Sequence, residues 1–294
     1  MENSVMVVVV IINWNGLQDT LKCIASLASS VQRVKYSVVL VDNGSTDGSQ
    51  DQLKQLDRVK LILLNANLGF AAATNIGIQW AIETGAHYVW LLNNDAIVVD
   101  GTLDHLLNVA EVDKKVGVVG SKVIRMGSNI VDHVGAKVSE WTSLPVFQGE
   151  GEEDRGQFEL VRETHYVSGC SLLASVEMIK EIGMMDEGYF LYYEETDWCV
   201  RARKLGWKVL YSPKSVVYHK VSSSVNRLQN AKVYYLTRNG IRFIKKNFSH
   251  RTPVAVLVAI GRRVLPLLLR GEFAEFKIAG RAIIDAISGK EGAK

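Results

Sequence analysis

A polar triplet, Asn93, Asn94 and Asp95, follows the apolar residues 88–92. Open α/β sheets bind ligands beyond the carboxyl ends of their strands, and a carboxylate there can hold a divalent cation such as Mg²⁺ or Mn²⁺. Such a cation can neutralise the charge of a diphosphate leaving group. The triplet contains only one acid, so a second protein ligand must come from elsewhere. His219, at the end of another strand-like run, is the best candidate, although a lone histidine is more often structural.

A second carboxylate group, Glu194, Glu195 and Asp197, follows the aromatic-rich residues 189–193. A carboxylate among aromatic rings is poorly hydrated, which raises its pKa and suits it to remove a proton from a hydroxyl group. The alternative is that these acids only stabilise the N-terminus of a helix. Arg201 follows on the same predicted helix, where it either pairs with the acids or faces a diphosphate.

Asp42 ends another predicted strand and begins a turn-rich loop. Its carboxylate could accept a hydrogen bond from the ring N3–H of uracil or thymine. Trp14 could form an aromatic wall for the same ring, and Asn13 could supply an amide donor. The alternative is an Asx turn that caps the next helix, beside a tryptophan that is simply packed.

Asn67, Gly69 and Phe70 precede a helix of small residues that carries Asn75. Small side chains allow the backbone to approach a nucleotide closely, and a helix N-terminus favours anions. Packing of the helix against a sheet explains the same pattern equally well.

The first 120 residues alternate between strand-like and helix-like segments, which is typical of a doubly wound, mostly parallel sheet with helices on both faces. The predicted strands are residues 5–12, 37–41, 61–64 and 88–92, and the predicted helices are residues 17–27, 49–56 and 72–83.

The remaining residues predict a hairpin-bearing insertion over the site and then further helices and strands. The insertion is predicted at residues 121–165, helices at 175–182 and 195–205, and strands at 208–211 and 215–219. The resulting domain prediction is a catalytic domain at residues 1–226, with a nucleotide-binding half (1–120) and an acceptor half (121–226), followed by a basic amphipathic helical extension at 227–294.

Composition limits the class of protein. The chain has 294 residues, of which 48% are hydrophobic and only four are proline, so it is not a disordered chain. Three cysteines without paired spacing indicate a reducing compartment, and we expect a cytoplasmic location. The N-terminus does not resemble a secretory signal. The apolar residues 254–260 are followed by Arg262 and Arg263, so no membrane span is predicted.

Charge is divided unevenly along the chain. Residues 221–294 contain 14 Lys and Arg against 4 Asp and Glu, a net charge of +10, whereas the rest contains 20 against 27, a net charge of −7. A basic, apolar tail on an acidic body predicts peripheral contact with an anionic membrane and no nucleic-acid partner. The alternatives are helices packed on the catalytic domain and a homodimer contact.

Together these segments resemble the family 2 glycosyltransferases, in their rhamnosyltransferase-like branch. The resemblance covers about residues 5–220 and consists of motifs at residues 9–16, 41–49, 67–77, 91–95, 169–171, 183–190 and 193–207.

The resemblance implies a GT-A fold and an inverting transfer from a nucleoside-diphosphate sugar, with dTDP-rhamnose first and UDP-hexoses next. The acceptor would be a glycan or a lipid-linked sugar of cell-surface polysaccharide synthesis. By this resemblance Asp42 reads the pyrimidine, Asp95 holds the metal and diphosphate, and His219 completes the metal site. Glu195 is the base. The family usually has Glu-Asp at that position, so Glu194 and Asp197 remain alternatives.

Two other classes remain open at this point. A sugar-phosphate nucleotidyltransferase shares the α/β nucleotide-binding start, but no Gly-rich basic loop follows the first strand. A non-catalytic nucleotide-sugar-binding scaffold could retain the fold without the chemistry. The transferase hypothesis requires residues 95, 195 and 219 to converge on one cleft.

Overall fold

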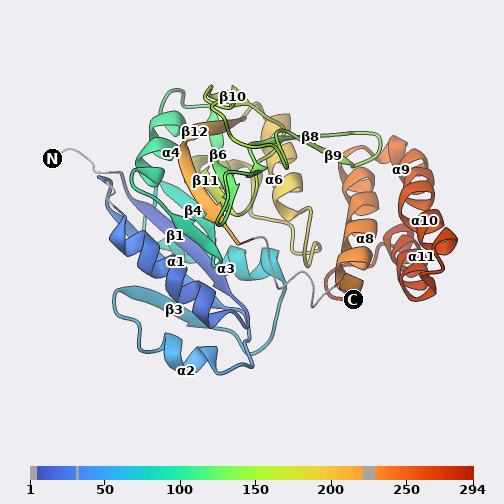
Figure 1. The fold of residues 1–294 in the computed structure, drawn as a ribbon, viewed down its shortest axis with the longest axis horizontal. Helices are drawn as coiled ribbons and strands as arrows, with labels where there is room; N and C mark the ends of the chain where they lie inside the picture. The colour runs from blue at the N-terminus through green and yellow to red at the C-terminus, as the bar shows by residue number, and fades with distance from the viewer. Residues whose placement is uncertain (1–4, 31–32, 221–228) are drawn as a thin grey trace.

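A ten-stranded sheet forms the centre of the protein in the computed structural model, which describes residues 5–30, 33–220 and 229–294 (Figure 1). The strand order is β10-β12-β6-β11-β4-β1-β2-β3, with β5 paired to β12 and β7 paired to β6. The N-terminal half supplies the parallel strands β1 (Val7–Asn13), β2 (Tyr36–Asp42), β3 (Val59–Leu63) and β4 (Tyr88–Asn93).

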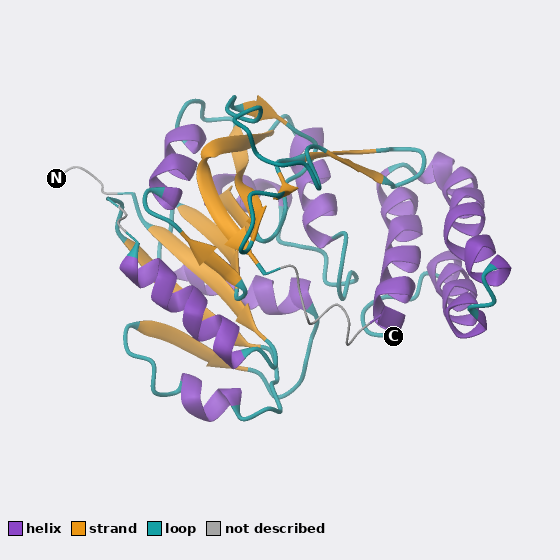
Figure 2. Ribbon diagram, viewed as in Figure 1, coloured by secondary structure: helices purple, strands orange, loops and turns teal. Residues whose placement is uncertain are grey.

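Alternate residues of β1 belong to different hydrophobic cores, because successive side chains of a strand point to opposite faces. Val8 and Val10 join one core, and Val7 and Val9 join the other. Helices therefore cover both faces of the sheet (Figure 2). They include α1 (Leu17–Ser29), α2 (Ser49–Leu53), α3 (Phe70–Glu83), α4 (Thr102–Ala110), α5 (Val176–Ile182) and α6 (Glu194–Lys204). The expected doubly wound, mostly parallel sheet is confirmed.

The second half of the sheet contains strands that the sequence pattern did not predict. β6 (Val116–Arg125) is almost entirely buried although it includes Gly120 and Lys122. β11 (Ser171–Ser175) lies antiparallel between β4 and β6. β12 (Lys208–His219) is one strand rather than the two expected, and a register shift between Ser212 and Val216 divides it.

Short strands form the predicted insertion and the edges of the sheet. The insertion contains β7 (Val131–His133) and an isolated hairpin of β8 (Ala136–Val138) and β9 (Pro145–Phe147), which confirms that it bears a hairpin. The sheet itself is extended by β5 (Ala96–Val98) and β10 (Arg162–Glu163).

The C-terminal residues form a separate group of helices at one side of the sheet (Figure 1). α8 (Gln229–Asn247) places Phe243 and Ile244 in the main core, so it packs on the part of the protein that contains the sheet. Behind it lie the 3₁₀ turn Ser249–Arg251, α9 (Thr252–Ala259), the π-helix η2 (Ile260–Val264), α10 (Leu265–Leu269) and α11 (Phe273–Ser288).

One stretch of these helices bears on the prediction that no segment spans a membrane. Residues Ser249–Leu269 form a helical segment that is long and apolar enough to cross a membrane by length and composition, although the sequence predicted no span. The basic residues Arg262 and Arg263 do not end the helix, because a π-helical turn carries it past them. Only 17% of the most apolar window is buried, so the apolar surface of this segment is largely exposed.

Candidate active site

Asp95 and His219 lie together at the carboxyl edge of the sheet, as predicted. Asp95 precedes β5, and β5 pairs with the end of β12, where His219 lies opposite Ala96. This pairing places Oδ1 of Asp95 3.2 Å from Nε2 of His219. The other ring nitrogen of His219, Nδ1, lies 3.0 Å from Oδ2 of Asp132 in the insertion. Asp132 was not predicted, because nothing in its local sequence distinguishes it.

The two carboxylates control the charge of the histidine. Burial lowers the pKa of His219, but the hydrogen bonds and charges of Asp132 and Asp95 outweigh burial and raise it to about 9. The imidazole is therefore protonated at neutral pH. A cation that binds at Nε2 must displace this proton, because a metal binds the neutral imidazole.

The donor set limits the kind of metal site. Across the residues that the structure describes, no group of three or more His, Cys, Asp or Glu side chains could hold a metal ion. Mg²⁺ often binds through one or two carboxylates together with substrate phosphates and water. Asp95 fits a cation of this kind, whereas the imidazole of His219 is a ligand more typical of transition metals. The remaining ligands would come from a diphosphate and from water.

A cleft of about 530 Å³ opens beside Asp95, and basic residues surround it. Lys22, Arg125 and Lys220 line the cleft together with Asp19. Lys220 forms a hydrogen bond to Asp19 at 2.9 Å. Arg125 pairs with Asp132 at 3.5 Å, so a diphosphate in this cleft would meet Lys22 and two cations that also have carboxylate partners.

The two asparagines of the polar triplet connect this edge to its neighbours. Asn94 donates a hydrogen bond from Nδ2 to Oγ1 of Thr20 at 2.9 Å, which ties the triplet to α1. The backbone N–H of Asn93 donates to the carbonyl of Cys170 at 2.9 Å. The end of β4 is therefore fixed on both sides.

Asp42 is fully buried, and protein groups satisfy its carboxylate. It accepts hydrogen bonds from Nδ2 of Asn13 at 2.7 Å, from the backbone N–H of Ser45 at 2.9 Å and from Nε2 of Gln50 at 2.8 Å. These bonds match the Asx-turn alternative. A pyrimidine ring would have to replace at least one of them. Trp14 is 38% exposed and follows the neighbouring strand β1.

The residues around the start of α3 attach this helix to the loop that leads to α6. Oδ1 of Asn67 accepts from the N–H of Gly69 at 2.8 Å, and the N–H of Phe70 donates to the carbonyl of Phe190 at 2.8 Å. Gly69 has φ +90°, and an added Cβ would lie 2.6 Å from that carbonyl oxygen, so only glycine fits. Asn75 binds the backbone N–H and C=O of Met185 in the same loop.

Glu195 lines a second cavity, of about 440 Å³. Oε2 of Glu195 and Oε2 of Glu194 are buried and make no hydrogen bond within the described part of the chain. Burial raises the pKa of both carboxyl groups, and for Glu194 the charge of Glu195 adds to this effect. A buried carboxylate with an unused oxygen and a raised pKa has the properties of a general base.

His133 lines the same cavity and was not predicted from the sequence. Its Nδ1 accepts a hydrogen bond from the N–H of Gly135 at 3.0 Å, and burial lowers its pKa to about 4. The neutral ring therefore carries its proton on Nε2. Among the described residues that Nε2–H has no partner, so it can donate to a ligand. A single histidine in an irregular insertion gives no sequence signal.

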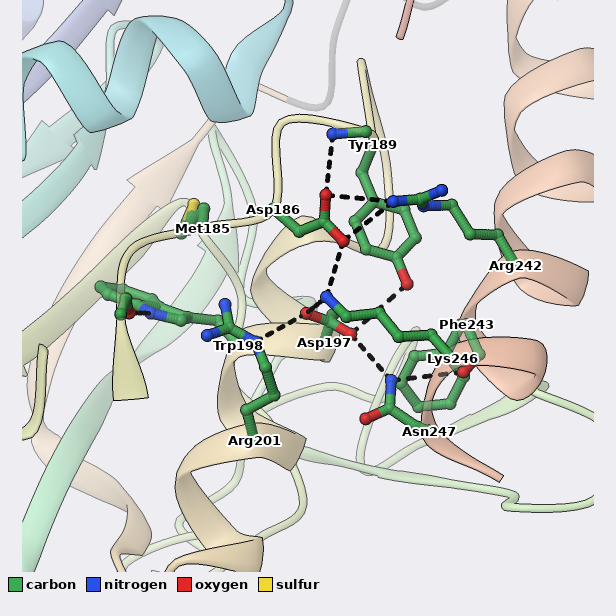
Figure 3. A network of polar contacts seen from close by, with 12 residues as sticks. Met185, Asp186, Tyr189, Asp197, Trp198, Arg201, Arg242, Phe243, Lys246 and Asn247 are labelled. Carbon is green, nitrogen blue, oxygen red and sulfur yellow. Dashed lines mark hydrogen bonds and ion pairs between the residues drawn. The ribbon is translucent and has the colours of Figure 1, made fainter. Parts of the chain in front are cut away.

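Asp197 and Arg201 belong to a network between α6 and α8 (Figure 3). The buried carboxylate of Asp197 accepts from Nε of Arg201 at 2.9 Å, from Nζ of Lys246 at 2.9 Å and from Nδ2 of Asn247 at 2.7 Å. The terminal nitrogens of Arg201 donate to the carbonyls of Ile182 and Met184. These contacts match the alternative in which Arg201 pairs with the acids of its own helix.

Asp95 and Glu195 line different cavities, and the convergence of residues 95, 195 and 219 on one cleft stays a prediction. Strand β7 reaches both groups, because Asp132 contacts His219 and the next residue, His133, lines the Glu195 cavity. The segment of residues 168–170 also lies near both groups: Ser168 lines the Glu195 cavity, and the carbonyl of Cys170 accepts from the N–H of Asn93. The sequence pattern gave no indication that the insertion would contribute residues to both groups.

Known proteins resemble this chain in sequence. The model of the family described as glycosyl transferase family 2 matches residues 8–183. The chain is 30% identical over 225 residues to an N-acetylglucosaminyl-diphospho-decaprenol L-rhamnosyltransferase of Mycobacterium tuberculosis, which covers 69% of this chain and 72% of the relative. It is 24% identical over 272 residues to the dTDP-rhamnosyl transferase RfbF of Shigella flexneri, which covers 88% of this chain and 85% of the relative.

Solved structures share the fold. A mannosyltransferase of Pyrobaculum calidifontis, in complex with GDP-Man and Mn²⁺, superposes with a TM-score of 0.58 at 15% identity, covering 97% of this chain and 88% of that one. GalNAc-T7, with UDP, GalNAc and Mn²⁺, gives a TM-score of 0.60 at 18% identity over 82% of this chain, which spans 51% of that structure. The protein has the GT-A fold and belongs to glycosyl transferase family 2.

Proposed function

We propose that the protein transfers a sugar, with rhamnose favoured, from a nucleoside diphosphate to a lipid-linked or glycan acceptor, with inversion at the anomeric carbon. The relatives whose names specify rhamnosyl transfer support this choice of sugar, and dTDP-rhamnose is the first donor to test, before UDP-hexoses. The observation that carries the proposal is Oε2 of Glu195, a buried oxygen without a hydrogen-bond partner among the described residues. It lies in a cavity also lined by His133, which follows Asp132, the partner of His219.

The donor binds, in this proposal, at the carboxyl ends of β1, β2 and β4. Asp42 and Asn13 hold the base next to Trp14, and the basic cleft beside Asp95 receives the diphosphate. A divalent cation held by Asp95 and His219 would neutralise charge on the departing diphosphate. Lys22 and Lys220, which line this cleft, compensate further negative charge.

The acceptor hydroxyl lies, in this proposal, beside Glu195. The hydroxyl oxygen attacks the anomeric carbon while the bond from that carbon to the diphosphate oxygen breaks on the opposite face. The hydroxyl proton passes to Oε2 of Glu195, which accepts no hydrogen bond from the described residues. His133 donates from Nε2 to another acceptor oxygen and so orients the sugar. Glu194 is the alternative base.

The C-terminal extension, in this proposal, contacts the cytoplasmic face of an anionic membrane. Its exposed apolar side chains include Leu257, Leu268 and Leu269, which are 68%, 40% and 86% exposed. These lie among cations of a segment with a net charge of +10. Apolar groups beside basic ones are typical of an interfacial helix.

Liposome flotation tests this contact. The wild type is expected to float with anionic liposomes, and Leu268→Glu/Leu269→Glu is expected to remain in the soluble fraction. Equal flotation of the two proteins would contradict it. Light scattering of both proteins would show instead whether the leucines form a homodimer contact.

A thermal-shift panel tests the proposed donor. Nucleoside-diphosphate sugars with Mn²⁺ or Mg²⁺ should raise the melting temperature, because a ligand that binds the folded state stabilises it. The expected order is dTDP-rhamnose above UDP-hexoses, with a smaller shift after chelation of the metal. A transfer assay with the best donor then separates an enzyme from a scaffold. Failure of every nucleotide sugar to shift the melting temperature would refute the proposal.

A further inference from the structure

The C-terminal extension supplies part of the wall of the Glu195 cavity. Lys232 of α8 and Arg263 of η2 both line it, opposite residues of α6 and of the insertion. Burial raises the pKa of Tyr193, and the neighbouring Arg263 guanidinium opposes this shift. Two cations from the extension therefore face the cavity that holds the candidate base.

These two cations are not committed to protein carboxylates. Within residues 5–30, 33–220 and 229–294, neither Lys232 nor Arg263 forms an ion pair, although Glu150 and Glu195 line the same cavity. Other cations of the extension behave differently: Arg242 pairs with Asp186 and Glu291, and Arg251 pairs with Glu140. Arg263 forms a hydrogen bond with the hydroxyl group of Tyr193, which leaves its charge without a carboxylate partner. Cations of this kind in a cavity suit an anionic ligand.

The position of Arg263 connects this cavity to the apolar surface. Arg263 lies in the five-residue π-helix inside the apolar segment Ser249–Leu269, and π-helical turns occur frequently at functional sites. The same segment exposes Leu268 and Leu269. One ligand could contact the carboxylate, the cation and the apolar surface together. It would place a sugar at Glu195, an anionic group at Arg263 and an apolar chain along the exposed leucines.

We propose that Lys232 and Arg263 bind the phosphate or diphosphate group that joins the acceptor sugar to its lipid. The extension then selects an anionic lipid-linked acceptor, and it fixes the distance between the charged group and the hydroxyl beside Glu195. This inference rests on the proposed glycosyl transfer, because that function makes the Glu195 cavity the acceptor site.

Binding tests the anion site without catalysis. Geranyl diphosphate is titrated into the full chain by tryptophan fluorescence, while the donor cleft is saturated with the nucleoside diphosphate that gives the largest thermal shift. Lys232→Gln/Arg263→Gln is expected to weaken binding at least about tenfold, since two charge-assisted contacts are lost. Arg270→Gln/Lys277→Gln removes the same two charges from exposed positions of the extension and is expected to bind as the wild type does. Equal affinity of all three proteins, or equal weakening in both variants, would overturn the inference.

Acceptor selectivity provides the second readout. Two acceptors are compared: a sugar linked to a lipid through diphosphate, and the same sugar on an uncharged alkyl chain. The ratio of their kcat/KM values, first over second, should fall at least about tenfold in Lys232→Gln/Arg263→Gln. Arg263→Lys should retain most of the ratio, and an unchanged ratio in the double variant would overturn the inference. A wild type that transfers sugar to neither acceptor would refute the proposed function, while the binding titration would still decide the anion site.

Discussion

Replacing Asp197 with asparagine should destabilise the protein strongly. The carboxylate is fully buried and accepts hydrogen bonds from Arg201, Lys246 and Asn247, which join α6 to α8 (Figure 3). Asp197→Asn keeps the shape of the side chain but removes its charge. It also places an NH₂ group among donors, where it has no acceptor.

The magnitude follows from the partners that are left behind. Removing one member of a buried ion pair costs about 3–5 kcal/mol. Here the cost lies at the lower end, about 3 kcal/mol, because Arg201 retains two backbone carbonyls and Lys246 retains Asp186 at 2.6 Å. Lys246→Met should cost less, about 1 kcal/mol, because the lysine side chain is 34% exposed and Asp197 keeps its other donors.

Urea denaturation followed by circular dichroism measures both changes, and the midpoint should fall with an unchanged m-value. Asp113→Asn is the matched control. It removes a carboxylate from an exposed pair with Lys208, and its midpoint should not be separable from that of the wild type. The reasoning would be refuted if Asp197→Asn unfolded at the wild-type midpoint, or if Lys246→Met were the more damaging change.

Further predictions concern the carboxyl pair and the packing of α3. Burial raises the folded-state pKa of Glu194 above its unfolded value, so the neutral form favours folding and stability falls as pH rises through the folded pKa. Glu194→Gln should therefore have a higher melting temperature than the wild type at pH 8 and the same melting temperature at pH 4. A difference in melting temperature that is the same at both pH values would contradict this. The raised pKa of Glu195 predicts that kcat declines with falling pH at a pKa above that of an ordinary glutamate, and a flat profile would argue against this base. Gly77→Ala should lower stability by about 1–3 kcal/mol, because the added Cβ would overlap the side chain of Val10. Gly280→Ala on α11 places its Cβ in open space and should be neutral or stabilising. The urea denaturation midpoints of the two variants measure this difference.

The N-terminal half of the fold was predictable from the sequence because its strands are buried on both faces. Such strands appear as short continuous apolar runs, and the structure confirms β1 and β4 within two residues of the predicted bounds. β6 was missed for a physical reason. It includes Gly120, where an added Cβ would lie 2.3 Å from Val167, so close packing there requires a residue that weakens the strand signal.

The candidate site was predictable only in part. The prediction rested on polar residues at the ends of two strands whose carboxyl ends lie at the same sheet edge. The approach of Asp95 to His219 itself depends on β5, which pairs with the end of β12 and was not predicted. The partners from irregular or distant segments were not predictable. Tertiary packing brings in three residues that the sequence did not indicate: Asp132, His133 and Arg263. No local sequence pattern marks the strand β7 that carries the first two.

The central claim is that a carboxylate in the second cavity activates an acceptor for sugar transfer. The most direct test measures turnover and donor binding of Glu195→Gln in parallel, with dTDP-rhamnose and a diphosphate-linked lipid acceptor. We predict a fall in turnover of roughly two orders of magnitude or more, as expected for the loss of a general base, with an unchanged donor-induced thermal shift. Turnover close to that of the wild type would contradict the claim.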